Sequence, residues 1–182
     1  MKNIFKASAL LFVGLSLVVS SCKKDEQIIE GCVDTMAMNF QSLATNDDGS
    51  CEYAYDIAQG VWNITSDCQE LTISIPLLGD FPVPLNDMFP DTIEITGNGD
   101  GVVAMDINGS DVLADIDSDG KVTIQEGQKV SFDTGVIGEV DVVITGSGTI
   151  ESASNGDLIL NLAFEIPLAG TQTSSCEIAF TK

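Results

Sequence analysis

The strongest constraint on the fold of this chain is a repeated alternation of apolar and polar residues along its sequence. The positions that recur at every second residue are Trp62, Ile64, Ser66 and Cys68, then Leu71, Ile73, Ile75 and Leu77, then Leu158, Leu160, Leu162 and Phe164, and finally Cys176, Ile178 and Phe180. A period of two is that of a strand with one buried face, and no segment has a convincing helical period.

Glycine-containing turn signals separate these runs about every ten residues. They are Asn98–Gly101, Asn108–Gly109, Asp119–Gly120, Gly146–Gly148 and Asn155–Asp157. Short strands joined by hairpins predict an all-β domain over residues 56–182. The pattern favours an antiparallel up-and-down barrel, with a β-sandwich as the alternative.

The chain is strongly acidic, with a formal net charge of −21, and it contains no histidine and no arginine. Such a surface repels nucleic acids, so we expect no nucleic-acid partner. The absence of histidine and arginine excludes Ser-His-Asp and Cys-His catalytic sites and metal sites built from histidine. It also excludes the binding of a phosphate or carboxylate group by arginine. An enzyme would need a carboxylate pair, and nothing in the sequence selects one.

Residues 1–21 have the form of a secretory signal peptide. Two lysines lie within the first six residues, followed by the apolar run Ala7–Val19 and then Ser20-Ser21. That run, about 13 residues, is too short to span a bilayer comfortably. Its removal takes away two of seven lysines and no acids, so the mature charge is 5 − 28 = −23. An ordinary signal peptide, or an uncleaved membrane helix, is the alternative.

Cys22 follows the two serines directly, and this arrangement resembles the lipobox of bacterial lipoproteins. The resemblance implies that the Cys22 thiol is acylated and that the chain is attached to a membrane by lipid alone. Residues 22–31 would then form a tether. Within it, Lys24-Asp25-Glu26 resembles the acidic export signals of Bacteroidota surface lipoproteins. The alternative interpretation is a solvated linker with no signal function. The expected location is the outer membrane, with exposure at the cell surface if the export signal acts.

Five cysteines are present, so assigning lipid to Cys22 leaves four that can form disulfides in an oxidising compartment. Four cysteines allow three connectivities. Cys68 lies in the first predicted strand and Cys176 in the last. Because closure of an up-and-down barrel makes these strands neighbours, the pattern favours a Cys68–Cys176 bond.

Residues 32–55 resemble a small cysteine-bracketed module of secreted Bacteroidota proteins. The similarity rests on Gly31-Cys32, on Asp34 and Ala37, and on Asp47-Asp48-Gly49-Ser50-Cys51. Thr35 stands where the family usually has proline. The resemblance implies a Cys32–Cys51 disulfide that closes a loop of about 20 residues. We therefore expect this module to be a spacer.

Residues 56–182 are similar to the lipocalin-like β-domains of Bacteroidota lipoproteins. The similarity rests on Ile57–Trp62 with a cysteine six residues later, on Gly146–Ile150, and on the final Cys176–Lys182. It implies a small barrel with Trp62 at its closed end. The apolar, proline-containing segment 76–90 either covers a barrel opening or forms a contact surface.

Residues 115–126 match the spacing of a calcium-binding EF-hand loop. The candidate calcium ligands are Asp115, Asp117, Asp119 and Glu126, with Gly120 at the sharp turn. However, the flanking residues read as strands, whereas an EF-hand needs helices. If strand pairing continues past the turn, Glu126 is drawn away from the aspartates. The alternative is a simple Ser-Asp-Gly hairpin turn.

These observations favour a lipid-anchored, non-catalytic binding domain. Its partner would be a small apolar ligand inside the barrel or a surface protein. The alternative is a calcium-assisted structural or adhesive component of the cell surface. Cavity volume separates these options, because a ligand carrier needs an interior of several hundred Å³.

Overall fold

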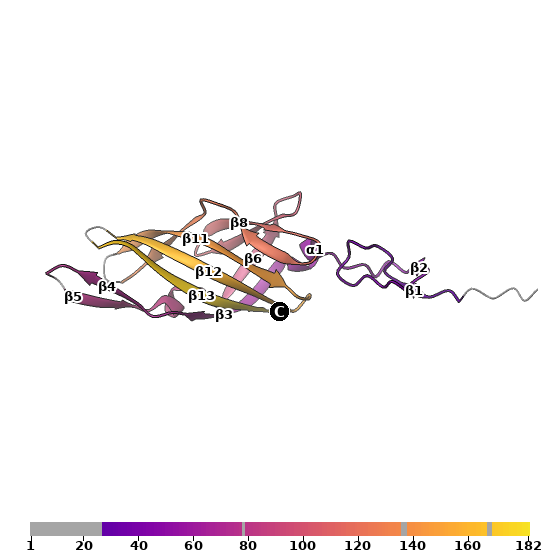
Figure 1. Ribbon diagram of the computed structural model, residues 1–182, viewed down its shortest axis with the longest axis horizontal. Coiled ribbons are helices and arrows are strands. Elements are labelled where there is room, and N and C mark those ends of the chain that lie inside the picture. The colour runs from indigo at the N-terminus through magenta and orange to yellow at the C-terminus, as the bar shows by residue number, and fades with distance from the viewer. Residues whose placement is uncertain (1–26, 78, 136–137, 167–168) are drawn as a thin grey trace, which may run out of the picture.

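The computed structural model describes residues 27–77, 79–135, 138–166 and 169–182. Most of this part of the chain is β-strand, which confirms the predicted all-β class. Figure 1 shows an elongated molecule with a small N-terminal module at one end of the long axis. The predicted signal peptide, the lipid site Cys22 and residues 23–26 lie outside the described ranges, in which no helix is long and apolar enough to cross a bilayer.

Eight antiparallel strands form a closed barrel. In order around the barrel they are β3 (Gly60–Cys68), β6 (Thr92–Gly97), β7 (Val102–Ile107), β8 (Ser110–Ile116), β9 (Lys121–Ile124), β11 (Glu139–Ile150), β12 (Asn155–Ile166) and β13 (Gly170–Thr181). Each strand pairs with the next, and β13 returns to pair with β3. The predicted up-and-down barrel is therefore confirmed, rather than the sandwich.

An additional strand, β10 (Lys129–Asp133), continues the path of β9 along β11. The two short strands pair with different parts of β11, and the interruption between them covers residues 125–128. Gln128 bridges this interruption, because its carbonyl accepts from the Ile144 N–H and its side chain accepts from the Leu113 N–H. Both β9 and β10 therefore stay paired with β11 on either side of the break.

The inward-facing residues of the barrel form one apolar core, as the alternation predicts. Along β12, every second residue from Leu158 to Ile166 is at most 3% exposed. Strands β7 and β8 add Val103, Met105 and Val112 to the same core. Burying a large aliphatic side chain stabilises a fold by about 1.5–3 kcal/mol, so this shared core is the main source of stability.

One predicted turn is wrong. Gly146–Gly148 lies inside β11, where Gly148 pairs with Leu158 on one side and Val122 on the other. A Cβ at Gly148 would collide with the Asp157 carbonyl oxygen, so this glycine permits close approach of the backbones instead of a turn. The turn expected at Asn155–Asp157 lies slightly earlier, because β12 already begins at Asn155.

A hairpin lies at the barrel end farthest from the module (Figure 1), and a short helix follows it in sequence. The hairpin comprises β4 (Leu71–Ile75) and β5 (Gly79–Val83), and η1 (Leu85–Met88) follows it. Ile73, Val83 and Leu85 are buried in the common core, and the Phe89 ring meets Phe132 edge-on. Residues 83–89 therefore cover part of the core, as one of the two expectations for segment 76–90 has it, whereas Leu77 at the hairpin tip is fully exposed.

The opposite end is closed by α1 (Ala54–Ala58) and Trp62. The Trp62 ring is fully buried, donates its indole N–H to the Ala58 carbonyl at 2.6 Å, and packs edge-on against Phe180. Lys182 lies over the Trp62 ring and donates to the Ile57 and Gln59 carbonyls at 2.9 and 2.7 Å. The last residue of the sequence is thus tied to the helix that precedes the first barrel strand.

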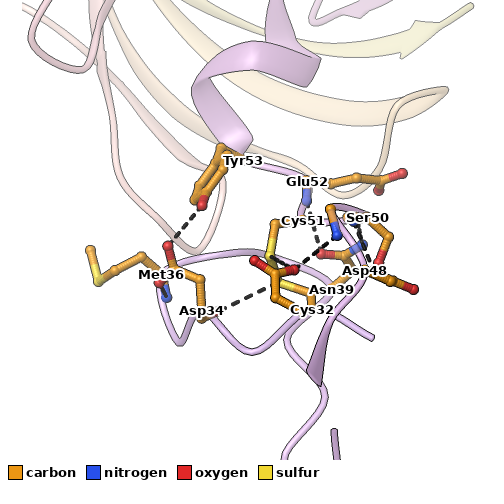
Figure 2. The surroundings of a disulfide bond; sticks show 11 residues. Cys32, Asp34, Met36, Asn39, Asp48, Ser50, Cys51, Glu52 and Tyr53 are labelled. Carbon is orange, nitrogen blue, oxygen red and sulfur yellow. Dashed lines mark hydrogen bonds between the residues drawn. A yellow bond between two sulfur atoms is a disulfide. The ribbon is translucent and has the colours of Figure 1, made fainter. Parts of the chain in front are cut away.

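Both expected disulfides are present. Cys32–Cys51 joins residues 19 apart in the module, around the two-residue strands β1 (Glu30–Gly31) and β2 (Asn46–Asp47) (Figure 2). Cys68–Cys176 joins residues 108 apart, which are direct register partners on β3 and β13. The second bond therefore links the first and last strands of the barrel.

We predict that the two disulfides contribute to different parts of the molecule. Replacing Cys68 and Cys176 together by alanine should lower the free energy of barrel unfolding by about 4–5 kcal/mol, because the bond closes a loop of roughly 100 residues. Urea denaturation followed by the fluorescence of Trp62, the single tryptophan, measures this change.

The matched control is the double alanine variant at Cys32 and Cys51. It should leave the Trp62 transition nearly unchanged, since that bond closes a local loop in the module. A loss below about 1 kcal/mol for the Cys68–Cys176 pair would contradict the assignment of that bond as a major constraint on barrel unfolding.

Candidate functional site

The barrel interior is filled. The cavity among its inward side chains measures about 10 Å³ and is lined by Ile64, Phe89, Ile93, Met105, Ile107, Leu158, Leu160, Ile178 and Phe180. A cavity of about 10–15 Å³ is just large enough to hold one water molecule, and ligand pockets commonly measure about 300–1,000 Å³. This cavity among the described side chains is too small for a small apolar ligand.

A much larger hollow lies on the outside of the barrel, across β11, β12 and β13. Its volume is about 470 Å³, and its lining residues are Gln69, Val143, Thr145, Asn161, Leu162, Ala163, Thr173, Ser174 and Ser175. None of these residues is charged, although the chain carries a formal net charge of −21. No local sequence pattern predicts this groove, because it arises where three strands align side by side.

The four candidate calcium ligands lie on a β-hairpin. Asp115 is in β8, opposite Thr123 of β9, and its Oδ1 accepts from the Gln125 side chain at 2.8 Å. Asp117 lies in the turn, where its Oδ1 accepts the N–H groups of Asp119 and Lys121 at 3.0 and 2.9 Å. This carboxylate caps the tight turn through its own backbone.

Glu126 lies beyond the end of β9 on the exposed surface. Pairing of β8 with β9 continues to Ala114 opposite Ile124, so Glu126 is carried along the strand away from the turn. Within the described ranges, no three Asp, Glu, Cys or His side chains gather closely enough to hold a metal ion. Calcium binding at this loop stays a prediction.

The turn has a structural role at the module end of the barrel. Gly120 has a φ of +81°, and its carbonyl accepts from the Ile150 N–H at 2.8 Å. An added Cβ at Gly120 would collide with the Ile150 carbonyl and lie 3.2 Å from the terminal methyl of Met38. The hairpin turn thus contacts both β11 and the N-terminal module.

In the module, carboxylates organise loops by accepting backbone hydrogen bonds (Figure 2). Asp34 accepts from the Met36 N–H and the Tyr53 hydroxyl, and these bonds lower the pKa of Asp34. The same contact with Asp34 raises the pKa of Tyr53. The Ser50 hydroxyl and N–H likewise lower the pKa of Asp48. These shifts arise from exposed loop contacts, so they do not mark a buried acid or base.

Comparisons with protein-family models, curated proteins and solved structures find no match to this chain.

We predict that Gly120 tolerates substitution less well than Gly127, which has the same φ of +81° but open space around its Cα. Gly127→Ala should cost about 1 kcal/mol from backbone strain alone. Gly120→Ala should cost at least about 2 kcal/mol more, because its methyl group meets the Ile150 carbonyl. Thermal or urea unfolding of the two variants measures the difference, and equal losses would contradict the described contact.

A second prediction concerns pH. Because the pKa of folded Asp34 is below 3.8, its hydrogen bonds stabilise the module above that pH and are lost as pH falls through the lowered pKa. Tyr53→Phe should raise the Asp34 pKa toward 3.8 without reaching it, since the Met36 N–H remains. Carboxyl NMR titration measures this shift, with Asp48 as an unchanged internal reference. An unmoved Asp34 pKa would show that the Tyr53 contact is absent.

The calcium prediction is tested by calorimetric titration of the mature chain beside an Asp117→Asn, Asp119→Asn variant. A specific site predicts heat at millimolar calcium in the natural sequence and none in the variant. Equal heats in both proteins, or none in either, would remove this loop as a calcium site.

Proposed function

We propose that this chain is a lipid-anchored protein of the bacterial outer membrane with a non-catalytic barrel that binds another protein through its outer surface. The signal-like residues 1–21 followed by Cys22 support the anchor. The different sizes of the interior cavity and the outer groove are the reason to prefer a protein partner over a small apolar ligand. The interior holds about 10 Å³, whereas the outer groove holds about 470 Å³.

The filled interior argues against a carrier of small apolar ligands, because binding would require several core side chains to move apart. Core packing resists such movement, since each displaced side chain loses its contacts. The outer groove is formed by strands whose inward faces are already packed. A protein can therefore bind there without disturbing the core.

The anchor is tested by mass spectrometry of the protein extracted from membranes. Processing and acylation predict a mature N-terminus at Cys22 that carries diacylglycerol, and Cys22→Ser should abolish the modification. A Cys51→Ser variant is the control, because it also replaces a cysteine by serine but leaves residues 1–22 unchanged. A protein with Ser21 at its N-terminus, or with an unmodified Cys22, would contradict the proposed anchor.

The partner class is tested by titrating the mature chain with a fluorescent fatty acid. We expect no saturable binding at micromolar concentration, because the cavity among the inward side chains is far smaller than the several hundred Å³ that such a ligand needs. Saturable binding to the natural sequence would overturn the preference for a protein partner and favour the ligand carrier.

A further inference from the structure

The outer surface of β11, β12 and β13 carries an uncharged face. We define this face by Val143, Thr145, Ile159, Asn161, Ala163 and Ser175, which point away from the core. The strand register sets Val143 beside Ala163, and Thr145 beside Asn161 and then Ser175. Ile159 is 49% exposed within this face. An uncharged surface with an exposed isoleucine is a suitable interface core, because charged residues are depleted there.

The two sides of the uncharged face carry opposite charges. Lys121 of β9 and Lys129 of β10 pair with β11 on one side, opposite Thr149 and Val143, and the exposed acids Asp133, Glu139 and Asp141 lie farther along the β10–β11 ladder. On the other side, Glu177 of β13 lies directly opposite Asp67 of β3.

This arrangement leaves both kinds of charge available to a partner. The described ranges contain three lysines, and Lys182 already donates to carbonyls at the α1 end, so Lys121 and Lys129 remain. Two carboxylates opposite each other across a strand pair repel, so Glu177 and Asp67 favour a nearby cation.

We propose that the uncharged face binds a second copy of this chain, related by a two-fold axis parallel to the strands. Such an axis places the lysine side of each copy over the acidic side of the other. A two-fold axis across the strands would instead place lysines over lysines. One face thus supplies both halves of a self-complementary interface.

The anchor gives an independent reason for the same axis, and this step rests on the proposed lipidation of Cys22. The module lies at one end of the long axis, along which β11, β12 and β13 run (Figure 1). An axis parallel to the strands keeps both modules at the same end, so both lipids can enter one bilayer. A two-fold axis across the strands would instead place the two modules at opposite ends of the dimer, so the two lipids would not lie on the same side.

The net charge restricts where two copies can meet. Each mature chain carries 5 − 28 = −23, so most orientations of two copies bring carboxylates together. On the uncharged face this repulsion is least, and the flanking lysines give attraction. The pairing of β12 with neighbours on both sides also means that the contact uses side chains rather than free strand edges.

The test uses the lipid-free mature chain, residues 22–182 with Cys22→Ser, so its outcome does not depend on acylation. Sedimentation velocity over micromolar concentrations should show a monomer–dimer equilibrium. Asn161→Lys should weaken the dimer at least about ten-fold, because it places two like charges near the axis. Thr96→Lys, an exposed position on β6 outside the face, is the matched control and should leave the equilibrium unchanged.

Exchanging the charges of Lys121 and Asp67 tests the direction of the two-fold axis. Lys121→Glu should weaken the dimer, and adding Asp67→Lys should restore it. Circular dichroism and the unfolding midpoint establish that each variant is folded. A monomer at every concentration, or a dimer insensitive to Asn161→Lys, would overturn the proposal. Weakening by Lys121→Glu without recovery in the double variant would overturn the parallel axis.

Discussion

The pairing of the first barrel strand with the last is the constraint on which the rest of this structure depends. Without the β3–β13 ladder the eight strands would form an open sheet with two exposed edges, which invite association with other chains. The ladder positions Cys68 opposite Cys176 and Phe180 opposite Ile64, where Phe180 also meets Trp62. Closure therefore determines the long-range disulfide and the packing of one barrel end.

The same closure determines where binding can occur. In a barrel of eight strands the interior is just wide enough for side chains to fill it, and large aliphatic residues do so in this chain. The apolar side chains stabilise the barrel, and the cavity described among them is too small for a ligand. The proposed recognition therefore uses the outer surface, where the residues that line the groove across β11, β12 and β13 are uncharged. A barrel fold by itself does not imply a carrier function.

Much of the fold could be predicted from the sequence because strand alternation is a local property. The alternating runs identified β3, β12 and β13, and closure of an up-and-down barrel predicted Cys68–Cys176. Gly146–Gly148 was misread because a glycine in a turn and a glycine between closely spaced backbones look alike in sequence. Only the register shows that Gly148 lies between Val122 and Leu158.

The site was less predictable, for a related reason. The spacing of Asp115, Asp117, Asp119 and Glu126 describes a loop wrapped around a cation, whereas hairpin pairing extends the same residues along two strands. The uncharged face has no local signal at all. Its residues come from three strands and become neighbours only through long-range pairing, so no single stretch of sequence contains the pattern.

Native-state hydrogen exchange, followed amide by amide, tests the closed and filled barrel most directly. The β9–β11 ladder is the decisive region, since only Ser147, Gly148 and Thr149 of β11 pair across it with β9. A closed barrel predicts that the hydrogen-bonded amides of this ladder and of the β3–β13 ladder are both protected, with opening free energies near that of global unfolding. Exchange of the β9–β11 amides at the rate of an unfolded chain, beside a protected β3–β13 ladder, would show an open sheet and contradict this account.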